Sequence, residues 1–214
     1  KRAEMLVAKV QDTEKLRKEL QQVKKLARER SKAVSLRIPQ LKDCKIHLDG
    51  KKAKGAESMI FITEGQSAAG SITSCRDVNT QAIFTLKGKP MNVCDLKRDA
   101  IYKNDELYNL MRTLNIEDSV EGLRYGKVIL ATDADVDGLH IRNLMVTFFL
   151  RFFEPLVQRG HVFILETPLF RVRTKKETIY CYSEAARDEA AKKLGKACEI
   201  TRFKGHGEIS PGEF

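Results

Sequence analysis

Three aspartates at alternate positions are the residues of this sequence best suited to chemistry. Asp133, Asp135 and Asp137 follow the apolar run 127–132, and Gly138 comes directly after them. A short run rich in β-branched and aliphatic residues is typical of a buried strand. Carboxylates this close repel one another unless a cation neutralises them, so the pattern indicates a site for a divalent metal ion.

A change of hydrophobic period places these aspartates at a turn. After Gly138 the apolar residues recur at steps of three and four, as on one face of a helix: Ile141, Leu144, Met145, Phe148, Phe149 and Phe152. The aspartates therefore lie between a strand and a helix, at the carboxyl end of the strand. Ligands of open α/β sheets bind at that edge.

The same spacing also opens a calcium-binding EF-hand loop, so two metals must be compared. An EF-hand needs a helix before the loop and a bidentate glutamate at its twelfth position. Here a strand comes first, and Leu144 is twelfth counting from Asp133. Magnesium needs fewer protein ligands and favours substrate phosphates. The sequence favours magnesium, and a solvated acidic turn or helix cap is the alternative.

A fourth carboxylate is expected at the same edge. The run 58–63 is a second buried strand that ends at Glu64, and the small residues 67–71 open a helix behind it. If this strand lies parallel beside the first, Glu64 and Asp133 meet. The free N–H groups of the helix would face the same edge and suit a phosphate.

Strands and helices alternate along most of the chain. Further strands are expected at 81–86 and 161–165, and a helix at 104–114. This order predicts an α/β fold with a doubly wound, mostly parallel sheet flanked by helices. Two hairpin strands near 169–173 and 178–182, with a helix capped by Ser183 and ending at Leu194, form a C-terminal hairpin-helix appendage.

The basic residues are concentrated at the N-terminal end. Residues 1–54 hold 17 Lys and Arg against 7 Asp and Glu, whereas the rest of the chain holds 22 of each. Residues 3–34 lack Gly and Pro and predict one long amphipathic helix with a narrow apolar stripe, which needs a partner surface. The basic excess suits contact with a polyanion, and a solvated helix face explains it equally well.

Composition excludes several classes of protein. The five cysteines are scattered and never form a Cys-x-x-Cys pair, which argues against a disulfide framework or a zinc site and for a reducing cytoplasm. No apolar run approaches the length of a membrane span, and no signal peptide is visible. The chain begins at Lys1 without a methionine, so we expect an excised fragment.

Four ordered motifs carry a resemblance to a known family. They are 132–142, 64–71, 81–89 and 202–208. Together they resemble the Toprim domain of type IIA DNA topoisomerases, and more narrowly the B subunits of the bacterial enzymes, over about residues 30 to 214. The short connection between the hairpin and Lys204 favours topoisomerase IV over its close relative gyrase.

The resemblance implies magnesium-dependent cleavage and religation of double-stranded DNA within ATP-dependent strand passage. Two Mg²⁺ ions would be held by Glu64, Asp133, Asp135 and Asp137, of which the first three are the expected catalytic residues. The attacking tyrosine would come from an A subunit in an A2B2 heterotetramer, and ATP would bind an absent N-terminal domain. This chain would therefore be inactive alone. The expected contacts to DNA phosphates are Lys87, Lys89, Arg142 and Lys204.

The resemblance also divides the chain. Residues 1–38 would be the last helix of a transducer segment, 39–57 an exposed linker, 58–170 the Toprim metal-binding domain, and 171–214 a truncated C-terminal extension. Gln66, Ala69 and His206 depart from the residues usual in the family.

Two other classes of function stay open. A Toprim nuclease or primase would use the same carboxylates without a partner's tyrosine, but it would lack the segments 86–89 and 204–208. A metal-stabilised interaction module without enzymatic activity is the third possibility.

Overall fold

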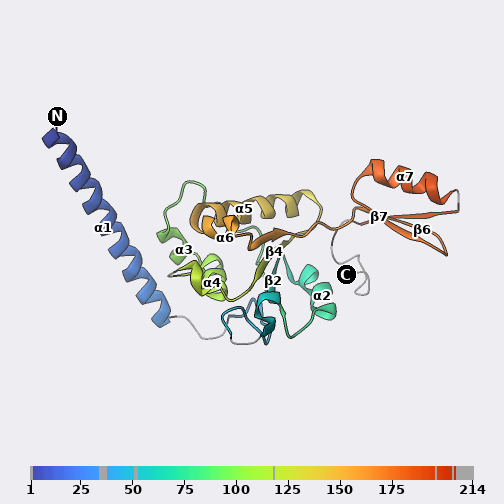
Figure 1. Cartoon of the computed structure of the whole chain (residues 1–214), viewed down its shortest axis with the longest axis horizontal. Coiled ribbons are helices and arrows are strands. Elements are labelled where there is room, and N and C mark those ends of the chain that lie inside the picture. Colours follow the sequence, from blue (N-terminus) through green and yellow to red (C-terminus); the bar gives the residue numbers. More distant parts are fainter. Residues whose placement is uncertain are drawn as a thin grey trace.

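The computed structural model describes residues 2–33, 38–50, 53–117, 119–195, 197–203 and 205. Its centre is a five-stranded sheet with the strand order β1-β3-β2-β4-β5, of which β2 and β4 are labelled in Figure 1. The strands are β1 (Leu41–Lys42), β2 (Met59–Thr63), β3 (Gln81–Thr85), β4 (Lys127–Ala131) and β5 (Val162–Ile164). The pairs β2–β3, β2–β4 and β4–β5 are parallel, and β1 runs antiparallel to β3. The predicted mostly parallel sheet is confirmed.

Helices cover both faces of this sheet because its strands carry apolar side chains in alternating directions. Ile60, Ile62, Val128 and Leu130 are buried in the main core with the apolar residues of three helices. These helices are α4 (Asp105–Leu114), α5 (Val136–Phe152) and α6 (Glu154–Gln158). On the opposite face Ile83 packs with α2 (Gln66–Cys75). The chain is therefore doubly wound, as its alternating pattern predicted.

Shorter helical elements complete the body of the fold. They are the 3₁₀ helices η1 (Ala53–Glu57) and η2 (Val120–Gly122) and the short helix α3 (Asp99–Lys103). None of the helices in the described part of the chain is long and apolar enough to cross a membrane.

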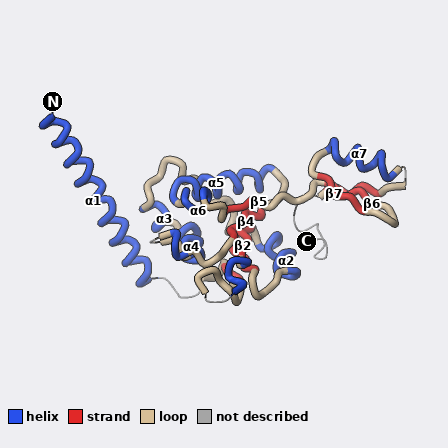
Figure 2. The backbone as a smooth tube through the Cα atoms, viewed as in Figure 1, coloured by secondary structure: helices blue, strands red, loops and turns tan. Residues whose placement is uncertain are grey.

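The C-terminal appendage is a small sheet with its own core. β6 (Phe170–Arg173) pairs antiparallel with β7 (Thr178–Cys181) and with β8 (Glu199–Arg202), apart from the central strands (Figure 2). α7 (Glu184–Leu194) covers it, and the Ser183 hydroxyl accepts a hydrogen bond from the Ala186 N–H at its start. The hairpin and the capped helix are confirmed. β8 was not predicted, because its side chains are mostly exposed and its pairing with β6 is long-range.

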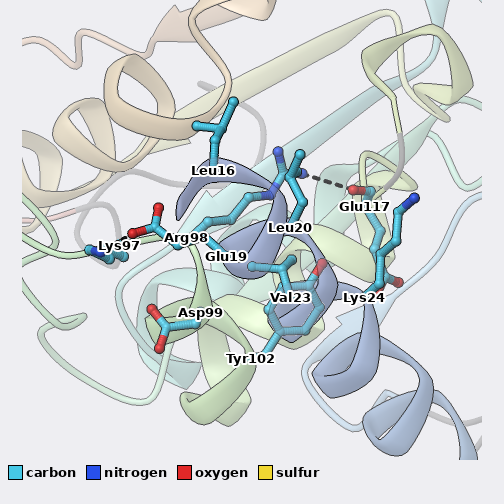
Figure 3. A pocket seen from close by; sticks show the side chains of 10 residues that line it. All are labelled: Leu16, Glu19, Leu20, Val23, Lys24, Lys97, Arg98, Asp99, Tyr102 and Glu117. Carbon is cyan, nitrogen blue, oxygen red and sulfur yellow. Dashed lines mark hydrogen bonds and ion pairs between the residues drawn. The ribbon is translucent and has the colours of Figure 1, made fainter. Parts of the chain in front are cut away.

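The predicted N-terminal helix is α1 (Arg2–Ala33), which extends away from the sheet in Figure 1. Val23 packs at the edge of the main core, and Glu19 forms an ion pair with Lys97 before α3. Leu16 and Leu20 of the apolar stripe are 61% and 55% exposed. They line an open groove of about 440 Å³ between α1 and α3, shown in Figure 3.

The expectation that residues 39–57 form an exposed linker is wrong for the part around β1. Gln40 and Cys44 are buried, and the Asp43 carboxylate accepts hydrogen bonds from Arg124 Nη2 and Tyr125 OH, each at 2.7 Å. His47 Nε2 lies 2.9 Å from the same carboxylate. The segment is bound to the body by partners about eighty positions away, and local periodicity contains no sign of them.

This network also determines what the cluster of Asp43, Cys44 and His47 can do. Their ligand atoms lie within 4.8 Å of one another, as in a metal site. However, Arg124 already provides a cation to Asp43, and burial raises the pKa of the Cys44 thiol, which disfavours the thiolate that a metal needs. We assign the cluster a structural role.

Replacing Asp43 with Ala should destabilise the chain by about 2–4 kcal/mol, because Arg124 and the buried Tyr125 hydroxyl lose their partner. Urea unfolding at pH 7 measures this. The exposed Asp95→Ala is the control and should change stability by less than about 0.5 kcal/mol.

The stabilisation by Asp43 should depend on pH. Burial raises its pKa, but the hydrogen bonds from His47, Tyr125 and Arg124 outweigh burial and lower it to about 2. A carboxyl whose pKa is lowered on folding stabilises above its unfolded pKa of about 3.9 and loses that effect as the pH falls toward 2. After allowance for its partial exposure, about 1–2 kcal/mol of the difference between the wild type and Asp43→Ala should vanish between pH 4.5 and pH 2. An equal loss in both proteins would contradict this.

Candidate metal centre

The parallel pairing of β2 with β4 brings the first two site residues together. Thr63 lies opposite Ala131 in the register, so Glu64 and Asp133 leave the same edge of the sheet. The backbone N–H of Asp133 donates a hydrogen bond to the Glu64 carboxyl, and the two side chains are also in hydrogen-bond contact. The predicted meeting of these two residues is what the structure shows.

The surroundings of Glu64 suit a cation. Burial, followed by the charges of Asp133 and Asp135, raises the pKa of Glu64. Its Oε2 atom is buried and has no hydrogen-bond partner among the described residues. A divalent ion would satisfy this oxygen and neutralise the surrounding carboxylates, and oxygen-only donors are those that Mg²⁺ prefers. These residues therefore fit the metal that the resemblance implies.

The three alternating aspartates have three different environments. Asp133 contacts Glu64. Asp135 is the N-cap of α5, where its Oδ1 accepts a hydrogen bond of 2.8 Å from the Gly138 N–H. Asp137, in the first turn of α5, pairs through Oδ1 with Lys89 Nζ at 2.7 Å, and this contact lowers the pKa of Asp137. The metal-site and helix-cap interpretations of the sequence are therefore compatible, because the cap uses only the Oδ1 atom of Asp135.

Two glycines make room for Asp133. A Cβ atom at Gly138 would lie 2.2 Å from the backbone oxygen of Asp133, so a side chain at this position would displace the turn. A Cβ atom at Gly205 would lie 2.7 Å from Oδ2 of Asp133. Gly205 itself thus lies against the candidate centre, which the sequence analysis missed because residues 133 and 205 are far apart in the chain.

A hollow of about 370 Å³ opens beside these carboxylates. It is lined by Asp133 and Asp135, by Val136, Leu139 and Arg142 of α5, and by Glu166 and Tyr182 among others. Arg142 is held there by a 3.3 Å hydrogen bond from its Nε to the Thr132 hydroxyl. The centre is therefore accessible to a large ligand and has a guanidinium in its wall.

The expected phosphate contacts divide into three groups. Arg142 lines the hollow, and Lys89 reaches Asp137. Lys87 is exposed on the loop that carries Lys89, and its backbone N–H donates to Glu106 Oε1 at 2.5 Å. Lys204 lies outside the described residues. The structure thus brings two of the four basic residues to the carboxylates.

The start of α2 lies next to this edge of the sheet. The helix begins at Gln66, immediately after Gly65, and Gly65 provides no side-chain cap. The first N–H groups of a helix lack intrahelical partners and favour an anion. The start of α2, which the sequence predicted to bind phosphate, therefore has no side-chain cap from Gly65.

Comparisons with known proteins agree with this geometry. The family model described as the Toprim domain matches residues 59–167. The chain is 59% identical to the B subunit of DNA topoisomerase 4 from Borreliella burgdorferi over 99% of its length, and 43% identical to the B subunit of DNA gyrase from Thermus thermophilus over 72%. It spans 35% and 26% of these two relatives.

A solved structure shows the same arrangement of elements. The DNA-binding, cleavage and re-ligation domain of Plasmodium falciparum topoisomerase II superposes with a TM-score of 0.70 at 26% identity, over 84% of this chain and 26% of that one. Sequence, fold and the carboxylate-lined edge of the sheet lead to one assignment. This chain belongs to the Toprim domain family.

Proposed function

We propose that this chain provides the Mg²⁺-binding half of the DNA cleavage and religation site of a bacterial type IIA topoisomerase. The observation that carries the proposal is the buried Oε2 of Glu64, which has no hydrogen-bond partner in the described part of the chain and lies beside Asp133, in a chain whose relatives include topoisomerase B subunits. Of the two relatives quoted above, the B subunit of topoisomerase 4 has the higher identity, so we assign the full-length protein to topoisomerase IV.

The reaction would be a transesterification in which a DNA phosphodiester is exchanged for a phosphotyrosine bond and later restored. Bound Mg²⁺ would stabilise charge on the phosphate oxygens. Glu64, Asp133 and Asp135 would hold two ions between them, with Asp137 completing the second site. The N–H of Asp133 orients Glu64, and the Asp135 cap fixes the turn. Arg142, in the wall of the hollow, would bind and orient a DNA phosphate.

The nucleophile would come from a partner A subunit. Tyr102, Tyr108 and Tyr125 are buried, which keeps their hydroxyl groups from a DNA phosphate. Tyr182 differs, because it is 57% exposed and lines the hollow beside the carboxylates. An enzyme that supplied its own tyrosine nucleophile would use this residue, whereas our proposal gives it no covalent role.

The five cysteines are all free in the structure, and we propose on this ground that the protein functions in a reducing cytoplasm.

Replacing Glu64 with Gln should separate metal binding from stability. Without metal, the raised pKa of Glu64 means that ionisation opposes folding above its unfolded pKa, so the variant should melt about 1–3 °C higher at pH 7. Mg²⁺ should raise the melting temperature of the wild type and not that of the variant. Calorimetric titration should show an affinity loss of about tenfold or more in Glu64→Gln and Asp133→Asn. Equal Mg²⁺ binding by the wild type and both variants would refute the site.

The partner's role is tested by trapping the covalent DNA adduct in the complete enzyme with its A subunit. We expect DNA on the A subunit only, and Tyr182→Phe should cleave as well as the wild type. Asp133→Ala should abolish cleavage and leave the assembly of the enzyme intact, because the core does not depend on this carboxylate. DNA attached to the chain described here would refute the proposal, whereas Mg²⁺-dependent nicking by this chain alone, without a covalent adduct, would support the stand-alone nuclease.

A further inference from the structure

The ion pair between Lys89 and Asp137 links two separate elements of the candidate centre. Lys89 follows β3 on a loop, and Asp137 is in the first turn of α5. The loop places Lys89 by its backbone geometry: Gly88 has φ 120°, which residues with side chains rarely adopt, and Pro90 behind Lys89 is buried. The lysine is therefore directed to the carboxylate by the fold.

The pair makes the carboxylates of the centre unequal. Glu64 and Asp133 contact each other, and the Oε2 atom of Glu64 has no partner among the described residues. The Asp137 carboxylate is already paired with the ammonium group of Lys89. A first divalent ion would therefore enter between Glu64 and Asp133, whereas an ion that uses Asp137 must first displace the ammonium group of Lys89.

The pair is also weak enough to exchange. Its side chains are 47% and 69% exposed, and exposed ion pairs contribute little to stability. The ammonium group is a compact charge on a flexible stem that can turn to a phosphate without a change of fold. Arg142 gives the same edge of the sheet a second basic group, so a bound phosphate backbone would pass within reach of such cations.

We propose that Lys89 is an exchangeable counter-ion of Asp137. In the free chain it holds Asp137 and weakens the binding of a second divalent cation; when a DNA phosphate takes up Lys89, Asp137 becomes available to that cation. DNA and the second cation then bind with positive coupling, and the coupling is reciprocal. This inference rests on the proposed function, since it needs DNA and metal at the same centre.

The test measures Mn²⁺ binding to this chain by electron paramagnetic resonance, with and without a duplex oligonucleotide. Without DNA, Lys89→Gln should bind the second ion about three- to tenfold more tightly than the wild type, because one neighbouring positive charge is gone. Lys89→Arg should behave like the wild type. DNA should strengthen the second site of the wild type by a similar factor and leave that of Lys89→Gln nearly unchanged.

Two further variants make the result specific. Lys103→Gln removes another exposed lysine, which is paired with Asp99 in α3, and should change neither ion's affinity. Asp137→Asn should weaken the second site even when combined with Lys89→Gln. Since Lys89 is on the surface, these proteins should fold, and circular dichroism checks that they do.

Three results would overturn the inference. They are wild-type affinity in Lys89→Gln without DNA, an equal effect of DNA on both proteins, and the absence of a second ion in every variant. Failure of the proposed function looks different, because Asp133→Asn would then keep the first ion. Loss of that ion in Asp133→Asn, with no effect of Lys89, would refute this inference alone.

Discussion

The contact between Glu64 and Asp133 is the interaction on which the site depends, and it is unfavourable in the absence of a cation. Parallel pairing of β2 with β4 imposes it, since opposite residues Thr63 and Ala131 deliver both carboxyl groups to one edge. Burial and the neighbouring charges raise the pKa of Glu64, because they oppose the ionised form of this carboxyl group. The hydrophobic cores on both faces of the sheet provide the stability that offsets this unfavourable contact.

Several close contacts hold the acidic turn in position beside Glu64. The Asp135 side chain caps α5, and Gly138 lets the turn close against the backbone of Asp133. Gly205, which follows β8, lies against the Asp133 carboxylate. The alternate aspartates of this turn therefore contact Glu64, cap α5 and pair with Lys89, and support of this kind from surrounding groups is what a metal site needs.

The surroundings combine attraction for an anion with attraction for a cation. The carboxylates suit Mg²⁺, while Arg142, Lys89 and the uncapped start of α2 suit phosphate. Such a mixture fits a ligand that carries negative charge and arrives with metal ions, as nucleic acid does. The basic excess of residues 1–54 lies mostly outside this centre, in α1 and the segment after it.

The amino-acid sequence alone determined the central parallel strands, the long helices and the acidic turn of this protein. Apolar runs, helical spacing and caps are local properties, so β2, β4, α5 and the Ser183 cap were predicted at nearly their observed positions. Neighbouring parallel strands then implied that Glu64 joins Asp133. Only the tertiary structure decided that Oε2 of Glu64 is buried with no partner among the residues it describes, that Lys89 binds Asp137, and that Gly205 lies against Asp133. It also showed that Asp43 binds Arg124 and Tyr125, which makes the expected linker part of the body. These contacts join residues tens of positions apart, and their geometry depends on packing, which no periodicity in one sequence encodes.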